Sequence, residues 1–275
     1  MNTILFVTDL YYPAKGRKYY KEDLFLTSQL RESFALTICH PKDIHAFEHH
    51  ADLIVIRNAG PVANFKDEYL SFRERAAANR YNIYNSLDGK GDMNGKDYLP
   101  ELAKAGYPVI PTIDDVQWLE ILPEAEAYIS KPKDGADSIG LERISRKDLA
   151  SKLSASVDRS ILIQPFIDFE YEVSFYFIDH EFQYALYAPD KEKRWRLAEY
   201  VPTAEDLKFA NRFIEWNNLA WGIQRVDACR TKQGELLLVE LEDLNPYLSL
   251  LELRPDVRQR FVEQFRRSLQ TALQA

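Results

Sequence analysis

Four charged residues near the C-terminus have a spacing that suits a metal site. They lie in "QRVDACRTKQGELLLVELEDLNP", residues 224–246, which has the pattern of a β-hairpin. Side chains alternate between the two faces of a strand, so Glu240 and Glu242 share a face, as do Arg225 and Asp227. If the hairpin turns at residues 232–234, Asp227 falls roughly opposite Glu240 and three carboxylates converge. Hard oxygen ligands suit Mg²⁺, which takes its remaining ligands from water and substrate phosphates.

The same alternation predicts which residues of the second strand enter the core. Leu237, Val239 and Leu241 share the face opposite the glutamates and are expected to be buried. Carboxylates held this close favour either protonation of one of them or a bound cation. The alternative is a solvated sheet face with scattered acids, although both strands carry charge only at their ends.

Two lysines have the surroundings of phosphate contacts. Lys131 ends a predicted strand in "ISKPKDGADSIG" and precedes a loop with Gly135, Ser138 and Gly140. Small residues let backbone N–H groups approach an anion, and the lysine supplies a point charge. A plain hairpin is the alternative. Lys96 begins a predicted helix and either reaches a phosphate or faces solvent.

A proline-interrupted crossover could hold a flat base by its edge. Gln164, Pro165 and Phe166 follow an apolar strand and lead into a second strand that carries Glu172. Proline removes one hydrogen-bond donor and halts strand pairing, which leaves backbone groups exposed beside the aromatic ring. An ordinary kinked crossover has the same sequence features.

The histidines offer a weaker signal. His45 and His49 are spaced i, i+4, as zinc ligands on a helix can be. We find no cysteine or carboxylate of matching spacing to complete a site, so a solvated helix is predicted. The glycines of residues 89–95 lack the spacing of a dinucleotide fingerprint.

The elements that must position these residues change in type along the chain. Apolar strands at residues 3–10, 35–41 and 52–58 alternate with helical patterns, which predicts a doubly wound parallel sheet for about the first ninety residues. Ligands bind beyond the carboxyl ends of such strands. The later sequence predicts antiparallel hairpins with helices, so the fold class is α/β followed by α+β.

Composition excludes several classes of protein. The 275 residues carry a net charge of −8, which disfavours binding to a phosphate backbone. No apolar run is long enough to span a bilayer, and no signal peptide is recognised, so a cytoplasmic location is expected. Cys39 and Cys229 lie in strand-like contexts and are expected to be packed thiols. The amphipathic segment 256–274 packs either on its own lobe or on a partner, as in a homodimer.

The order and spacing of these motifs resemble the ATP-grasp superfamily of carboxylate–amine ligases, such as D-alanine–D-alanine ligase and glutathione synthetase. The likeness is clearest in the Arg-x-Asp strand and the Glu-x-Asn strand followed by proline, although Glu242 stands where these enzymes commonly have asparagine. The resemblance implies a pre-ATP-grasp domain over residues 1–90 and an ATP-grasp domain over 91–275. The latter would have a small lobe at about 108–165 and a C-terminal lobe at about 166–275.

The resemblance also implies a role for each motif. Lys96 and Lys131 would contact the phosphates of ATP, with residues 135–140 as a lid over them. The remaining roles would be an adenine hinge at Gln164, Pro165, Phe166 and Ile167, a ribose contact at Glu172, Mg²⁺ ligands at Asp227, Glu240 and Glu242, and stabilisation of the transferred phosphoryl group by Arg225. The implied reaction phosphorylates a carboxylate to an acyl phosphate, which an amine then attacks.

The acceptor carboxylate needs a cation of its own. Candidates for this contact are Lys15, Arg17, Lys18, Arg57, Arg194 and Arg196, each of which is otherwise a surface charge. Guanidinium groups can grip a carboxylate with two hydrogen bonds. Two other functions remain open: a nucleotide-binding regulatory protein that does not catalyse ligation, and an ATP-dependent phosphotransferase.

Overall fold

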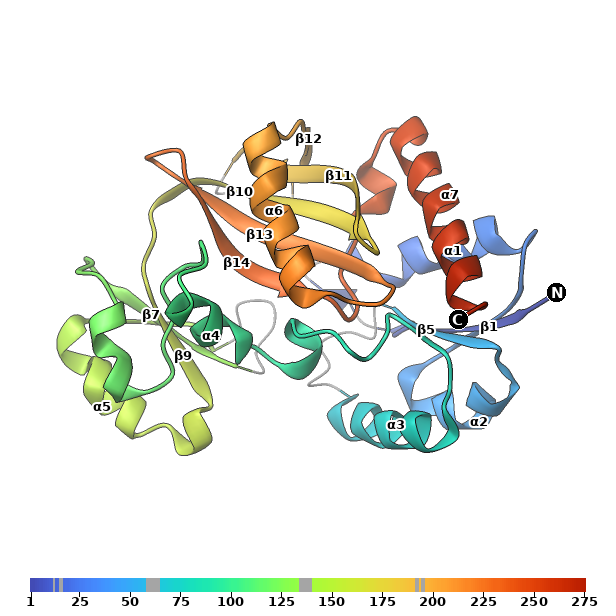
Figure 1. Cartoon of the computed structure of the whole chain (residues 1–275), viewed down its shortest axis with the longest axis horizontal. Coiled ribbons are helices and arrows are strands. Elements are labelled where there is room, and N and C mark those ends of the chain that lie inside the picture. Colours follow the sequence, from blue (N-terminus) through green and yellow to red (C-terminus); the bar gives the residue numbers. More distant parts are fainter. Residues whose placement is uncertain (12, 15–16, 58–64, 134–139, 191–192, 194–195) are drawn as a thin grey trace.

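The structure is a computed structural model that describes residues 1–11, 13–14, 17–57, 65–133, 140–190, 193 and 196–275 (Figure 1). Its strands are β1 (Thr3–Val7), β2 (Pro13–Ala14), β3 (Arg17–Lys18), β4 (Ala35–Cys39), β5 (Leu53–Ile56), β6 (Ile83–Tyr84), β7 (Tyr128–Pro132), β8 (Glu142–Ile144), β9 (Ile161–Pro165), β10 (Phe169–Ile178), β11 (Glu181–Ala188), β12 (Ala198–Tyr200), β13 (Ile223–Thr231) and β14 (Leu236–Glu242). Its α-helices are α1 (Tyr20–Leu30), α2 (Ile44–Phe47), α3 (Lys66–Asn79), α4 (Tyr98–Lys104), α5 (Leu149–Ser154), α6 (Ala204–Asn217) and α7 (Pro255–Ala272). Short 3₁₀ helices include η1 (Pro41–Asp43), η2 (Glu48–His50), η4 (Asp92–Asn94) and η5 (Val116–Ile121).

The N-terminal part of the chain forms a parallel sheet with strand order β4-β1-β5-β6. Alternation along β1 sends Ile4 and Phe6 to the face that α1 covers, and Leu5 and Val7 to the face that α2 and α3 cover. Both faces are buried, which explains why β1 and β5 are continuous apolar runs. The predicted doubly wound parallel sheet is confirmed.

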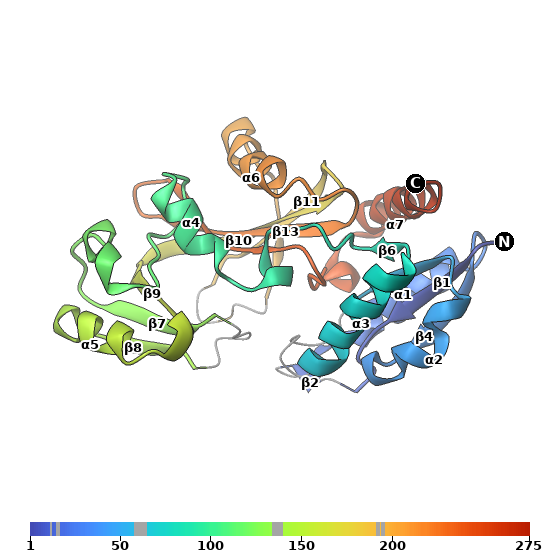
Figure 2. The same ribbon diagram turned by 60° about the horizontal axis from the view of Figure 1, so that its bottom comes forward.

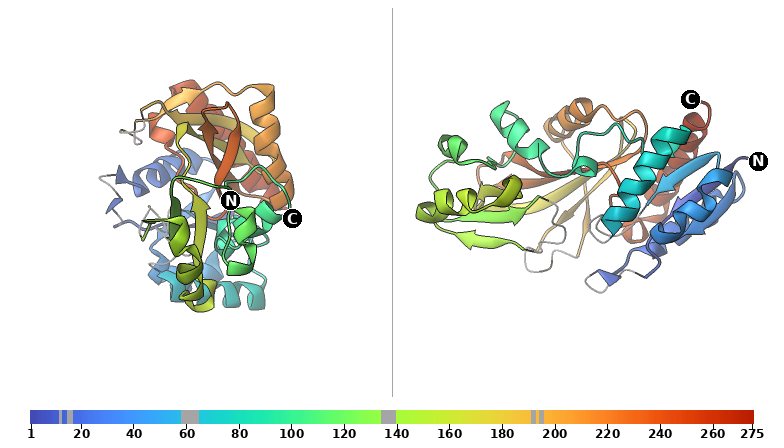
Figure 3. Two further views of the ribbon diagram at one scale, coloured as in Figure 1. Left: turned by 90° about the vertical axis from the view of Figure 1, so that its left-hand side faces the viewer. Right: turned by 90° about the horizontal axis from the view of Figure 1, so that it is seen from below.

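Two antiparallel sheets follow. The first, with order β8-β7-β9, forms a small lobe with α5, whose Leu149 and Leu153 pack against Tyr128 and Ile163 of the strands. The second has the order β12-β11-β10-β13-β14 and contains both predicted hairpins, β10–β11 and β13–β14. The small lobe and the N-terminal sheet lie at opposite ends of this five-stranded sheet (Figures 2 and 3).

Helix α6 covers one face of the five-stranded sheet. Its Phe213 and Ile214 pack with Val226 of β13 and Leu238 of β14 in one buried cluster. The opposite face of these two strands is therefore free to carry polar side chains. It is this face that bears the charged residues of the predicted metal site.

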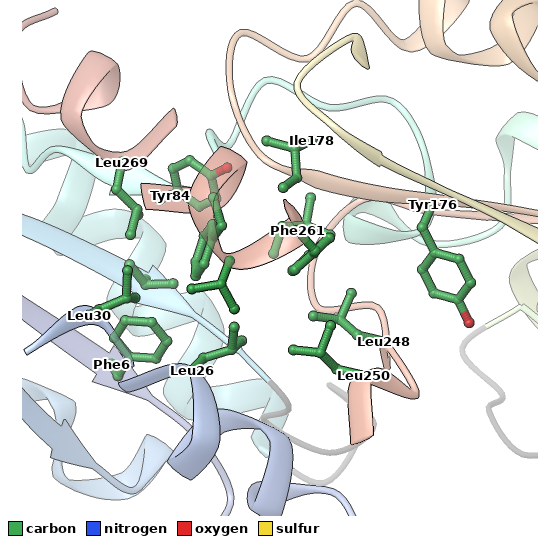
Figure 4. Close-up of a cluster of buried hydrophobic side chains, with 14 of the residues drawn as sticks. Phe6, Leu26, Leu30, Tyr84, Tyr176, Ile178, Leu248, Leu250, Phe261 and Leu269 are labelled. Carbon is green, nitrogen blue, oxygen red and sulfur yellow. The ribbon is translucent and has the colours of Figure 1, made fainter. Parts of the chain in front are cut away.

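Helix α7 joins the N-terminal sheet to the five-stranded sheet. Its Phe261 and Leu269 share one buried cluster with Phe6 of β1 and Ile178 of β10 (Figure 4). Burying a side chain of this size contributes about 1.5–3 kcal/mol. The core therefore crosses the predicted domain boundary near residue 90, and the C-terminal helix packs within its own chain.

A buried ionic network also crosses that boundary. Arg57, which follows β5, is completely buried and lies 3.1 Å from Glu22 and 3.4 Å from Asp23 of α1. Its Nη1 donates to the carbonyl oxygen of Pro246 at 2.8 Å, while Glu22 accepts from the N–H of Leu248 at 2.9 Å. The network thus fixes the segment after β14 to the N-terminal sheet.

Removing the cation of this network is expected to destabilise the protein. Arg57→Met leaves Glu22 and Asp23 buried without their guanidinium partner, a change that typically costs about 3–5 kcal/mol. Urea denaturation measures the loss in the free energy of unfolding. Arg196→Met, at an exposed arginine, is the matched control and should stay within about 0.5 kcal/mol of the parent. Equal stability of the two variants would contradict the prediction.

The expectations for the cysteines are also met. Cys39 and Cys229 are both free and buried, as predicted for packed thiols. Burial raises the pKa of each thiol to about 12, so neither is an activated nucleophile. Within the ranges that the structure describes, no helix combines the length and the apolar character needed to cross a bilayer.

Candidate active site

The register of β13 and β14 brings the predicted carboxylates together. Asp227 pairs with Glu240, and Arg225 pairs with Glu242. Directly opposed residues of an antiparallel pair have Cβ atoms about 4.5–5.5 Å apart. The predicted convergence of three carboxylates and one arginine is therefore confirmed as geometry.

A β-bulge after Asp227 changes the faces of β14. It adds one residue to β14 between the partners of Asp227 and of the residue that follows, so Val239 lies outside the pairing. The prediction that Leu237 and Val239 are buried with Leu241 is wrong, because the extra residue reverses the alternation. Both are half-buried, and the buried leucines of the strand are Leu236, Leu238 and Leu241.

The guanidinium of Arg225 holds the cluster together. Its Nε and Nη2 donate to the two oxygens of Asp227 at 2.8 and 2.7 Å, and Nη2 also contacts Glu242. Nη1 donates to the carbonyl oxygen of Tyr247 at 2.8 Å. Burial opposes the charge, but Asp227 and Glu242 raise the pKa of Arg225 well above its ordinary value. Ser174 of β10 adds a hydrogen bond of 2.6 Å to Asp227.

The donor set of the cluster fits Mg²⁺. Its candidate ligands are carboxylates only, and Mg²⁺ prefers oxygen ligands. Burial raises the pKa of Glu242 to about 8, an effect that Arg225 opposes and that the charges of Asp227 and Glu240 reinforce. A bound divalent cation would reverse this and favour the ionised carboxylate.

Both predicted phosphate lysines lie beside this cluster. Lys96 Nζ is 2.9 Å from Glu240 Oε1. Burial opposes its charge, but Glu240 raises the pKa of Lys96 above its ordinary value. Burial lowers the pKa of Lys131 on β7 to about 8, with Glu240 opposing this shift and Lys96 adding to it. Two cations from separate segments thus lie beside Glu240 of β14, a suitable arrangement for a polyphosphate.

Asp243, which directly follows β14, positions the loop that leads to Lys96. Its carboxylate accepts from the N–H of Gly91 at 2.8 Å and from that of Met93 at 2.9 Å. A Cβ on Gly91 would lie 2.8 Å from the Asp243 carboxyl carbon, so only glycine fits there. The residue after β14 therefore holds the loop that leads to Lys96. The paired glycines of "DGKGD" were the available signal for this close contact.

Comparison with solved structures decides the fold. No protein-family model matches the chain, and no curated protein does either. D-cycloserine synthetase DcsG matches with a TM-score of 0.70 and 21% identity, over 95% of this chain and 99% of that one. D-alanine–D-alanine ligase from Bacillus anthracis, complexed with ATP, gives 0.67 and 12%, over 100% and 98%. The ATP-grasp ligase PsnB, complexed with a phosphomimetic variant of minimal precursor, Mg and ADP, gives 0.60 and 16%, over 98% and 98%.

The chain has the ATP-grasp fold. The likeness extends over the N-terminal sheet as well as the two antiparallel sheets, since each comparison covers nearly the whole chain. At these identities it concerns the fold, so the chemistry must be argued from the side chains of this chain.

The predicted adenine hinge of the ATP-grasp fold links β9 of the small lobe to β10. Gln164 and Pro165 are buried, and Gln164 donates to Thr112 Oγ1 at 2.8 Å. Phe166 is exposed, but its N–H donates to the carbonyl oxygen of Ala127 at 2.9 Å. Of the backbone groups that were expected to be exposed beside the ring, the N–H of Phe166 is therefore bonded within the protein. Binding of adenine at this link, with Ile167 as its last residue, stays a prediction.

Glu172, the predicted ribose contact, lies on the same sheet face as the carboxylate cluster. It is half-buried on β10, two residues before Ser174, which pairs with Asp227. Alternation places Glu172 and Ser174 on one face. A ligand that reaches along this face from Asp227 would therefore meet Glu172.

The structure describes only some of the residues that were predicted to contact the acceptor carboxylate, and little of the predicted lid at residues 135–140. Residues that lie outside the described part of the chain are Lys15, Gly135, Ser138 and Arg194, together with the side chain of Arg17. Lys18 and Arg196 are exposed. The prediction that Arg57 contacts the acceptor carboxylate is corrected. This side chain is fully buried in its ionic network, because its partners on α1 and the segment after β14 enclose it. It positions Pro246 and offers no open surface to a substrate carboxylate.

Proposed function

We propose that the protein is an ATP- and Mg²⁺-dependent carboxylate–amine ligase. One observation carries this proposal: Arg225, three carboxylates and two lysines from different segments converge on one face of an ATP-grasp sheet. Phosphoryl transfer depends on positioning and charge neutralisation more than on covalent help from the protein. This set of side chains supplies both.

The proposed reaction has two steps. An oxygen of the substrate carboxylate attacks the γ-phosphorus of ATP, the bond to the β-phosphate oxygen breaks, and ADP leaves. The amine nitrogen then attacks the acyl carbon, the bond to the phosphate oxygen breaks, and phosphate leaves while the nitrogen loses a proton. Lys96 and Lys131 hold the phosphates, and Arg225 meets the charge of the transferred group. Asp227, Glu240 and Glu242 would hold Mg²⁺, which neutralises charge on the β- and γ-phosphates when bound.

Two other functions use the same fold. A regulatory nucleotide-binding protein needs the lysines, but it has no need of Arg225 together with three carboxylates, and these residues are in contact here. A phosphotransferase would stop at the phosphorylated acceptor. The ligase alone requires a second, amine substrate for steady release of ADP and phosphate.

A substrate screen tests the proposal. ADP and phosphate are measured with pairs of acids and amines, including amino acids and peptides with acidic side chains, in the presence of Mg²⁺ and after chelation. The expected result is turnover that needs both substrates and Mg²⁺. A phosphorylated product formed without an amine would favour the phosphotransferase, and metal-insensitive release of ADP would overturn the proposal.

ATP affinity is expected to fall as the pH rises above 8. Burial lowers the pKa of free Lys131 to about 8, and bound phosphates would raise it. Above pH 8 the free lysine loses its proton and must regain it on binding, so the Kd rises by up to about tenfold per pH unit. Titration with a non-hydrolysable ATP analogue between pH 7 and 9.5 measures this change. Lys131→Arg stays protonated and should show a flatter profile; equal slopes for both proteins would contradict the role of Lys131.

A further inference from the structure

A second cluster of ligating side chains lies outside the proposed active site. His45, Glu48 and His49 belong to α2 and η2, which connect β4 to β5. These elements pack on the face of the N-terminal sheet that is opposite to α1 and α7. The proposed ligase reaction uses none of the three residues.

The three residues offer donors at one point on the surface. One atom from each, a ring nitrogen or a carboxylate oxygen, lies within 4.8 Å of the others. His45 Nδ1 is 2.9 Å from Glu48 Oε1, and the two imidazole centroids are 5.9 Å apart. Donors around tetrahedral zinc are about 3.3 Å apart, given zinc–nitrogen distances near 2.0 Å. The side chain of His45 is 68% exposed, so its rotation can close the remaining gap.

The surroundings already orient two of the three donors. Arg75 of α3 donates to both oxygens of Glu48, at 2.5 and 2.9 Å. Each carboxylate oxygen has two lone pairs, so Oε1 keeps one that faces His45. The Tyr81 hydroxyl contacts His49 Nδ1, which leaves Nε2 of that ring for a metal. Metal-binding histidines and carboxylates usually have such hydrogen bonds on their second atoms.

The ligand types also matter, because two of the three donors are ring nitrogens and one is a carboxylate oxygen. A buried carboxylate between two exposed imidazoles favours a borderline metal over Mg²⁺, which takes oxygen ligands. Its chemistry thus differs from that of the all-carboxylate cluster on β13 and β14.

We propose that His45, Glu48 and His49 bind a divalent transition-metal ion of the Zn²⁺ type, with water as the fourth ligand. The ion replaces the hydrogen bond between His45 and Glu48. The bound ion links the α2–η2 segment to α3 through Arg75. It also links this segment, through Tyr81, to the residues that follow α3. The sequence-based expectation of a solvated helix did not consider Glu48, which the structure places beside both histidines.

Zinc titration of the full-length protein tests this site. The Glu240→Gln background weakens competing binding at the carboxylate cluster. We expect one Zn²⁺ per chain by calorimetry, and an unfolding temperature raised by roughly 5–10 °C at one hundred times the Kd. Co²⁺ in place of Zn²⁺ should give the visible absorption of a four-coordinate ion. Neither readout depends on ligase activity, so failure of the proposed function would leave both unchanged.

Histidine substitutions decide between the site and general surface binding. In the same background, the pair His45→Ala and His49→Ala should weaken zinc binding by at least 100-fold and abolish the cobalt absorption. Tyr81→Phe should weaken binding by roughly tenfold, as expected for an orienting partner. His50→Ala is the matched control, since His50 is an exposed neighbour outside the cluster. Equal zinc affinity in the double variant and in His50→Ala, or no binding to the parent, would overturn the proposal.

Discussion

Glu240→Gln is expected to lower kcat for ADP release by about 10²–10³-fold, the usual cost of removing one preorganised charge contact from a transition state. Glu240 lies opposite Asp227 in the hairpin and 2.9 Å from Lys96. The amide keeps the shape of the side chain but removes the charge that a cation needs. The midpoint of the Mg²⁺ dependence should therefore move to higher concentration. Steady-state assays with the substrates found in the screen measure both changes.

A glutamate on the same hairpin supplies the control for this substitution. Glu235 is exposed and precedes β14, so Glu235→Gln makes the same chemical change away from the cluster. It should leave kcat and the Mg²⁺ midpoint unaltered. The unfolding temperature of Glu240→Gln should stay close to that of the parent. Unchanged phosphate release by the folded Glu240→Gln protein would remove the basis of the ligase assignment.

Local patterns predicted the approximate centre of the site. The turn at residues 232–234 and the two-residue period of strands predicted that Asp227 and Glu240 lie roughly opposite each other, and the structure pairs them. The bulge beside Asp227 was not predictable, because an extra residue in one strand leaves no mark in the period-two pattern of "LLLVELE". Without the bulge, the pairing of Cys229 with Leu237 and of Ala228 with Leu238 would continue to Asp227 and Val239. The bulge instead brings Glu240 opposite Asp227.

Roles that depend on distant segments could not be read from local patterns. Arg57 follows an apolar strand, where a cation suits a substrate carboxylate, but its partners lie 34 and 35 residues away on α1. Only the packing of α1 on the sheet encloses all three charges. Asp243 is a similar case, since its partners Gly91 and Met93 precede it by about 150 residues. In both cases the sequence suggests a chemical role, but the folded chain uses the side chain to hold a distant segment in place.

Arg225→Lys is expected to reduce kcat by about 10²–10³-fold while the KM for ATP changes much less. The planar guanidinium contacts both oxygens of Asp227, one oxygen of Glu242 and the carbonyl of Tyr247 at once. A lysine ammonium keeps the positive charge but lacks the fork geometry that makes these contacts together. Single-turnover measurement of ADP formation, with saturating ATP and substrate, isolates the phosphoryl-transfer step from product release.

The split between kcat and KM distinguishes transition-state stabilisation from nucleotide binding. In the proposed function the lysines beside Glu240 hold ground-state phosphates, so Lys131→Ala should act mainly on the KM for ATP. Arg225 lies among the carboxylates, where the proposed reaction develops the charge of the transferred group, so its loss should act mainly on kcat. If Arg225→Lys instead raised KM and left kcat intact, Arg225 would be a nucleotide-binding residue. The same cluster would then support a regulatory ATP site better than a ligase.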